Sequence, residues 1–206
     1  MDKKTKIEVG ILLFNDADVL DFTGPFEVFA MAEKNSKKLF NVSTIGETGD
    51  LLTACNGFKV EPTHNFVHHP KLDILIIPGG YGAEEVEVKN NTVLKWIKKQ
   101  YENVVILASV CTGAILLAEC NFLDSKKATT HWMFIDELKE RYPKVNVVQN
   151  QKFVDEGKII TAAGISAGIN MSLHIIKRIF DIEVAKTTAK RIEYDIDNQQ
   201  LQNKTR

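Results

Sequence analysis

The sequence predicts an α/β protein built on a doubly wound, mostly parallel β-sheet, with helices on both faces and a small β-appendage. Short apolar, β-branched segments alternate with helix-like segments along the chain. Several of these segments are apolar at nearly every position, as strands buried on both faces are. The 206 residues, 44% hydrophobic and 26% charged, are ordinary for one soluble domain. We therefore expect a single domain over residues 1–206.

Segments rich in Val, Ile, Leu and Phe are the expected strands: residues 7–14, 38–46, 72–77, 104–110, 145–148 and 152–162, with short extra strands in 51–61. The expected helices are residues 25–33, 92–101, 113–118, 132–141, 169–180 and 183–194. Pro25 suits the first position of a helix, so Asp21 should lie just ahead of that helix, at the carboxyl end of the first strand. Thr129 or Thr130 should cap the helix over 132–141, and the tail 195–206 should be frayed.

The chain is organised around residues 104–118, which read VVILASVCTGAILLA. A buried strand passes there into a helix, and Cys111 and Thr112 lie at the junction. Small residues on either side allow the tight turn with which α/β proteins present a nucleophile. Backbone N–H groups at the start of the following helix would favour a thiolate, so we expect a lowered Cys111 pKa. The alternative is an inert core cysteine.

Composition excludes several other classes of function. The net charge of −1 gives no basic surface for nucleic acid or for an anionic membrane. Three cysteines without metal-type spacing, and no apolar leader, indicate a reducing compartment, so we expect a cytoplasmic protein. His64, His68 and His69 lie in a Pro-bounded loop without carboxylates at ligand spacing, and we expect neither a metal nor a cofactor.

Five separated motifs then show a resemblance to the ThiJ/PfpI superfamily that extends to about Tyr194. They are Leu20-Asp21-Phe22-Thr23-Gly24-Pro25, Pro78-Gly79-Gly80, Ser109-Val110-Cys111-Thr112-Gly113, Ala128-Thr129-Thr130-His131-Trp132 and Gly164-Ile165-Ser166-Ala167-Gly168. Within the superfamily the chain resembles the isonitrile hydratases. It is also similar to the amino-terminal ligand domains of AraC-type transcription regulators. No helix-turn-helix segment follows, so direct DNA binding is not expected.

The resemblance implies roles for particular residues. Cys111 matches the nucleophile, Asp21 the facing acid–base carboxylate, and Thr112 the neighbour that helps to hold the polar group. Backbone N–H groups of Gly80 and Thr112 match oxyanion-type donors, and Gly79 and Ile165 belong to the expected substrate pocket. The resemblance also implies a homodimer with the active site near the subunit interface. Because Thr112 replaces the His that follows the nucleophile in protease-like branches, peptidase chemistry is disfavoured, and His131 is expected to be structural.

The implied activity is the addition of water to an isonitrile, R–N≡C, which gives an N-substituted formamide. Cys111 would attack the terminal carbon while Asp21 delivers a proton, and Asp21 would then activate water against the thioimidate. A carboxylate beside a thiolate should share one proton with it, mostly on Asp21. Two other functions stay open: a redox-sensing or stress cysteine protein, and a small-molecule binding module related to the regulator domains.

Overall fold

A seven-stranded sheet forms the centre of the structure, a computed structural model that describes residues 6–196. The strand order is β12-β13-β9-β8-β1-β4-β7, and every neighbouring pair is parallel except β12 and β13. The strands are β1 (Ile7–Leu12), β4 (Phe40–Gly46), β7 (His64–Asn65), β8 (Ile74–Ile77), β9 (Ile106–Ser109), β12 (Phe153–Glu156) and β13 (Ile159–Ala162). All four residues of β8 and of β9 are buried, as expected for central strands covered on both faces.

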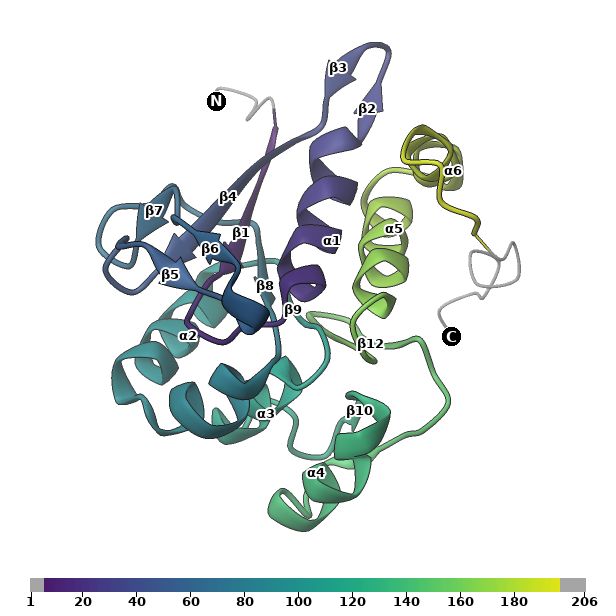
Figure 1. The fold of residues 1–206 in the computed structure, drawn as a ribbon. Coiled ribbons are helices and arrows are strands. Elements are labelled where there is room, and N and C mark those ends of the chain that lie inside the picture. The colour runs from purple at the N-terminus through teal and green to yellow at the C-terminus, as the bar shows by residue number, and fades with distance from the viewer. Residues whose placement is uncertain (1–5, 197–206) are drawn as a thin grey trace.

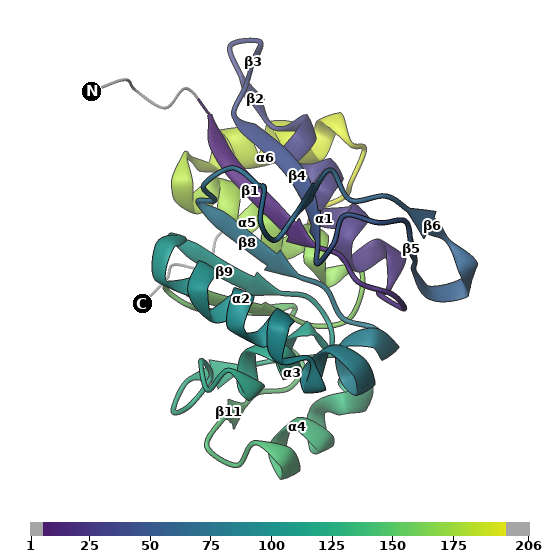
Figure 2. The ribbon, with the colours of Figure 1, turned by 90° about the vertical axis from the view of Figure 1, so that its left-hand side faces the viewer.

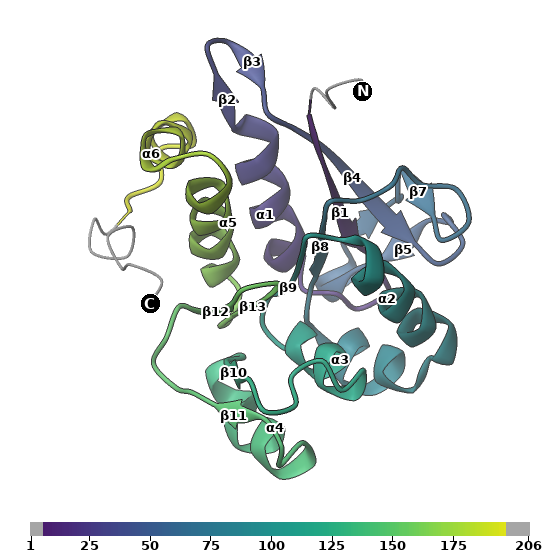
Figure 3. The same ribbon diagram turned by 180° about the vertical axis from the view of Figure 1, so that it is seen from behind.

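Helices cover both faces of the sheet (Figures 1, 2 and 3). One face carries α1 (Val19–Met31), α5 (Ala167–Ile179) and α6 (Ile182–Arg191), which pack together, and the other carries α2 (Asn91–Asn103) and α3 (Gly113–Glu119). The remaining helix, α4 (Ile135–Arg141), extends from one end of the molecule (Figure 1). Short helical turns are η1 (Cys55–Gly57), η2 (Gly82–Val86), η3 (Glu87–Lys89) and η4 (Trp132–Phe134). The predicted fold class is confirmed.

Three pairs of two-residue strands lie outside the central sheet. They are β2 (Glu33–Lys34) with β3 (Lys37–Lys38), β5 (Leu52–Thr53) with β6 (Lys59–Val60), and β10 (Lys127–Ala128) with β11 (Asn146–Val147). The β5–β6 pair is the expected appendage, whereas the β2–β3 hairpin was not predicted. In the described part of the chain, no helix is long and apolar enough to cross a membrane.

Two local predictions are wrong. Helix α1 begins at Val19 rather than at Pro25, which lies inside it, so Asp21 belongs to the first helical turn instead of the preceding loop. The helix extends toward its N-terminus because Phe22 adds to the buried face and Thr23 Oγ1 donates to the Val19 carbonyl at 2.7 Å. Neither Thr129 nor Thr130 is a cap: the ring of His131 accepts the Met133 N–H at the start of η4. The predicted tail 195–206 lies mostly outside the described residues.

Strand register aligns the segments that carry the candidate site. Ile76 pairs with Ile11 of β1 on one side and with Ala108 of β9 on the other. The segments that follow β1, β8 and β9 therefore leave the sheet at one edge, where parallel α/β sheets bind ligands. In Figures 1 and 3, the first turn of α1 lies beside the same ends of β8 and β9.

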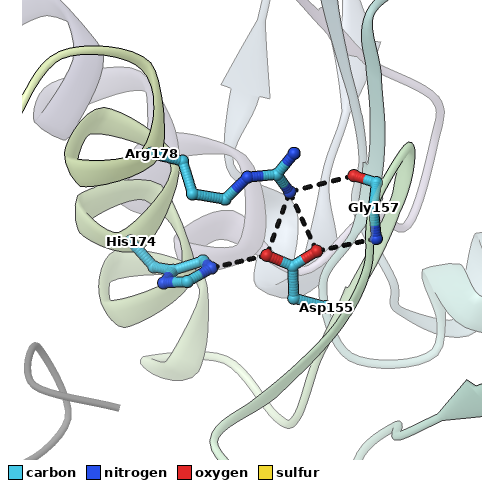
Figure 4. Close-up of polar contacts among 4 residues, drawn as sticks. All are labelled: Asp155, Gly157, His174 and Arg178. Carbon is cyan, nitrogen blue, oxygen red and sulfur yellow. Dashed lines mark hydrogen bonds and ion pairs between the residues drawn. The ribbon is translucent and has the colours of Figure 1, made fainter. Parts of the chain in front are cut away.

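A polar cluster ties the antiparallel edge strand to α5 (Figure 4). The Asp155 carboxylate accepts from His174 Nε2 at 2.7 Å and from Arg178 at 2.8 and 2.9 Å, and Gly157 N–H donates to it at 2.8 Å. The side chains of Asp155 and His174 are each only 7% exposed. Burial alone would raise the pKa of Asp155, but the hydrogen bonds from His174 and Gly157 and the charge of Arg178 outweigh it and lower this pKa.

Asp155→Asn should therefore destabilise the fold at neutral pH by roughly 1–3 kcal/mol, because it removes the charged acceptor of the cluster. The folded pKa lies below the unfolded one, so this contribution is present above about pH 4 and is lost as the pH falls through the folded pKa. Urea unfolding at pH 7 and at pH 3 measures it, with exposed Glu156→Gln as the control. An equal loss at both pH values would contradict this account.

Candidate active site

Cys111 lies at a strained turn between β9 and α3. Its φ is +56°, in the left-handed region that non-glycine residues seldom adopt. The turn is held by hydrogen bonds on both sides of Cys111: its N–H donates to the carbonyls of Ala162 and Ala163 at 3.2 and 3.0 Å, and its own carbonyl accepts the Thr130 hydroxyl at 2.8 Å. The residue is 3% exposed. The predicted tight turn between strand and helix is thus present, and Cys111 occupies its left-handed position.

Gly79 brings a second loop against this turn. A Cβ atom at Gly79 would lie 2.5 Å from the Thr112 backbone nitrogen and 3.0 Å from the Cys111 Cβ, so a side chain there would displace one loop or the other. The Gly79 N–H donates to Asp21 Oδ2 at 2.9 Å. Gly79 therefore connects the cysteine turn with the first turn of α1.

Asp21 is fully buried and faces the cysteine. One of its carboxylate oxygens and the Cys111 Sγ lie within 4.8 Å of each other. While Oδ2 is held by Gly79, Oδ1 has no partner among the described residues. A buried carboxylate oxygen without a donor is costly in a folded protein and often marks a functional group.

The pair is harder to ionise than isolated side chains. Burial raises the pKa of Asp21 to about 7, with the nearby Asp18 charge adding to it and the Gly79 N–H opposing it. Burial and the Asp21 carboxylate also raise the pKa of the Cys111 thiol, although the backbone N–H groups of Thr112 and Ile165 act in the opposite direction. The expected lowering of the Cys111 pKa is therefore wrong. Desolvation exceeds the effect of the helix N-terminus, and at neutral pH the sulfur keeps its proton.

The predicted oxyanion donors are placed differently from expectation. Gly80, at a φ of +113°, directs its N–H to Thr112 Oγ1 at 2.9 Å, so this N–H is not free for a substrate. Thr112 is fully buried, and Glu84 lies near its hydroxyl. The Thr112 backbone N–H faces the Cys111 sulfur, and the Thr112 hydroxyl oxygen accepts the Gly80 N–H. The expectation of a free Gly80 donor is thereby corrected.

Ile165 borders both the sulfur and a surface cleft. Its backbone N–H faces Cys111, its φ of +45° is unusual for a β-branched residue, and its side chain is 40% exposed. The cleft of about 660 Å³ has Ile165 in its wall but not Cys111, and it is otherwise formed mainly by residues 129–132, 149–152 and 163–164. His131 lies in this wall against Gly164, where a Cβ would come within 2.2 Å of the imidazole.

Asp18 is a member of the site that the sequence interpretation missed. Donor atoms of Asp18, Asp21 and Cys111 all lie within 4.8 Å of one another. These atoms are close enough together to bind one metal ion. Within residues 6–196, His64, His68 and His69 belong to no such cluster. The sequence did contain a signal for Asp18, because residues three apart on a helix lie on the same face. Asp18 and Asp21 have this spacing once the helix is known to begin at Val19.

The chain is similar to known proteins over most of its length. The model of the DJ-1/PfpI family matches residues 7–178. Isonitrile hydratase from Pseudomonas putida is 30% identical over 189 residues, which cover 91% of this chain and 78% of that protein. The HTH-type transcriptional regulator CdhR from Pseudomonas aeruginosa is 30% identical over 200 residues, which cover 95% of this chain but only 59% of the regulator.

Solved structures show the same fold. A ThiJ/PfpI family protein from Pseudomonas syringae superposes with a TM-score of 0.79 at 24% identity, covering 93% of this chain and 76% of that one. Drosophila melanogaster DJ-1beta gives a TM-score of 0.80 at 18% identity, covering 93% and 100%. Together with the family match over most of its length, these findings establish that the chain belongs to the DJ-1/PfpI family.

Proposed function

We propose that the chain is an isonitrile hydratase-like enzyme that adds water to R–N≡C and releases an N-substituted formamide. Cys111 is the nucleophile, and Asp21 transfers the proton. The observation that carries this proposal is a nearly buried thiol within 4.8 Å of a buried carboxylate that keeps one oxygen without a partner. The similarity to isonitrile hydratase from Pseudomonas putida supports the substrate class.

An isonitrile suits this pair for two reasons. Its terminal carbon is a narrow, linear end that can reach the sulfur of a cysteine only 3% exposed, whereas an amide group is much broader. The same carbon takes up both the sulfur and a proton, so one thiol and one adjacent base supply everything the first step requires. The substrate is also uncharged, which matches a site surrounded by Asp18, Asp21 and Glu84.

In the first step the Cys111 sulfur bonds to the terminal carbon while its proton passes to Asp21. Asp21 then delivers this proton to the same carbon, giving the thioimidate R–N=CH–S–Cys111 with Asp21 ionised again. Addition of water to the C=N bond and cleavage of the C–S bond release R–NH–CHO and return the thiol. A pKa of about 7 allows Asp21 to act as base and as acid in turn at neutral pH.

The other predicted site residues have supporting roles in this proposal. The N–H groups of Thr112 and Ile165, which face Sγ, stabilise negative charge on the sulfur during attack and release. Gly79 positions Asp21, and Gly80 positions the Thr112 side chain. The homodimer expected from the family resemblance remains part of the proposal.

Of the two alternatives, the redox sensor is the weaker one. Sensor cysteines are accessible and have lowered pKa values, whereas Cys111 is nearly buried and its pKa is raised. The binding module keeps support from the regulator relatives, which align with almost the whole chain. Turnover of an isonitrile would distinguish the enzyme from the binding module.

Cys111→Ser should abolish hydration of small isonitriles, with a fall of at least about 10³-fold, because a serine hydroxyl is far less acidic than a thiol of similar size. Formamide release is measured by chromatography, and a thermal melt confirms that the variant is folded. Cys120→Ser is the matched control, since Cys120 is a second buried cysteine outside the site. Turnover at the wild-type rate in Cys111→Ser would exclude Cys111 as nucleophile.

Asp21→Asn should lower turnover by roughly 10²–10⁴ while the fold is retained, since the amide cannot transfer the proton. The same change should stabilise the protein at pH 8 by roughly 1–3 kcal/mol. The folded pKa lies above the unfolded value, so the stability linked to protonated Asp21 is complete below about pH 4 and is lost as the pH rises through about 7. Urea unfolding at pH 5 and pH 8, together with turnover, measures both effects. Near-normal turnover would refute the mechanism.

A further inference from the structure

We propose that Asp18 is a second catalytic carboxylate, which binds and deprotonates the water that hydrolyses the Cys111 thioimidate. This assignment rests on the proposed function and extends it. In this scheme, Asp21 exchanges a proton with the Cys111 sulfur, and Asp18 accepts a proton from the water.

Asp18 occupies a helix N-cap position without acting as a cap. It precedes α1 with φ −68° and ψ 125°, yet its side chain accepts no N–H from the first turn. Asp181, at the same position before α6, does cap, because its carboxylate accepts the Val184 N–H at 2.9 Å. The Asp18 carboxylate is therefore directed away from the helix N-terminus, and the fold obtains no capping energy from it.

The backbone of Asp18 is fixed to the site on both sides. Its N–H donates to the Gly79 carbonyl at 3.0 Å, and its own carbonyl accepts the Asp21 N–H at 3.1 Å. One Asp18 carboxylate oxygen lies within 4.8 Å of both the Cys111 Sγ and an Asp21 oxygen. A single water can bridge polar atoms up to about 5 Å apart, because each of its hydrogen bonds spans about 2.8 Å.

The two carboxylates differ in access to water. Asp21 is fully buried, and one of its oxygens is held by Gly79, whereas Asp18 is partly exposed. Asp21 Oδ1, which has no partner among the described residues, gives the site a further free acceptor. The Cys55 thiol, from the loop between β5 and β6, donates to the Asp16 carbonyl at 3.1 Å and lies near Asp18. Because Asp18 is partly exposed while Asp21 and Cys111 are buried, it is the member of this trio that a water molecule reaches first.

The hydrolytic step balances with these groups alone. Asp18 takes a proton from water as the water oxygen bonds to the thioimidate carbon, and it passes that proton to the nitrogen, giving R–NH–CH(OH)–S–Cys111. The C–S bond then breaks with its electron pair on sulfur. The hydroxyl proton passes through Asp18 to the Cys111–Asp21 pair, and R–NH–CHO leaves. No oxidant, reductant or further reactant is needed.

The experiment mixes cyclohexyl isonitrile with wild-type protein, Asp18→Asn, Asp21→Asn and Asp181→Asn. Each reaction is quenched in acid over a time course and analysed by intact-protein mass spectrometry, with formamide measured in parallel. Asp181→Asn is the matched control, because it changes another helix-preceding aspartate that lies outside the site. Thermal melts report folding, and Asp18→Ala with and without added formate tests whether a free carboxylate restores hydrolysis.

We expect Asp18→Asn to form the adduct of one isonitrile on Cys111 at a rate near that of wild type and to accumulate it. Its formamide release should fall about 100-fold. Asp21→Asn should form no adduct at a comparable rate, and formate should accelerate Asp18→Ala. Wild-type turnover in Asp18→Asn, or loss of adduct formation together with turnover, would overturn the role of Asp18. A wild-type protein that neither reacts nor turns over would instead refute the proposed function, and this assignment with it.

Discussion

The burial of two acidic groups side by side is the constraint on which the rest of the site depends. Asp21 and Cys111 are both almost out of contact with solvent. Burial raises the pKa of each, and the Asp21 carboxylate raises the pKa of Cys111 further. Two negative charges cannot be accommodated there at modest cost, so the pair holds at least one proton at neutral pH. An isonitrile matches a pair that holds one proton, because its terminal carbon bonds to the sulfur and also accepts that proton.

The fold keeps this unfavourable arrangement in place through backbone contacts. Strand register brings the ends of β1, β8 and β9 to one edge of the sheet. The positive φ of Cys111 is held by hydrogen bonds from residues far along the chain, and Gly79 leaves no room for a side chain between the two loops. Strain and desolvation at such a site are offset by the apolar core that the central strands form.

Sequence patterns predicted the sheet, the cysteine turn and the place of Asp21 at the carboxyl end of the first strand, because these depend on apolar periodicity and on the common edge of parallel strands. That Asp21 faces Cys111 was implied by the family resemblance. Other features depend on three-dimensional contacts. Pro25 was expected to begin α1, and this one displaced boundary concealed Asp18. The direction of the Cys111 pKa could not be obtained from the helix N-terminus alone, because desolvation decides it. The engagement of Gly80 with Thr112 follows from a backbone conformation that no residue pattern specifies.

The central claim is that Asp21 loses its proton near neutral pH while Cys111 keeps its own. Infrared difference spectroscopy over a pH titration tests it directly, with the carboxyl band assigned through Asp21→Asn and the S–H band through Cys111→Ser. The account predicts that the protonated carboxyl band disappears with a midpoint near pH 7 while the S–H band persists. Loss of the S–H band near pH 7 with the carboxyl still protonated, or an Asp21 already ionised at pH 5, would contradict it.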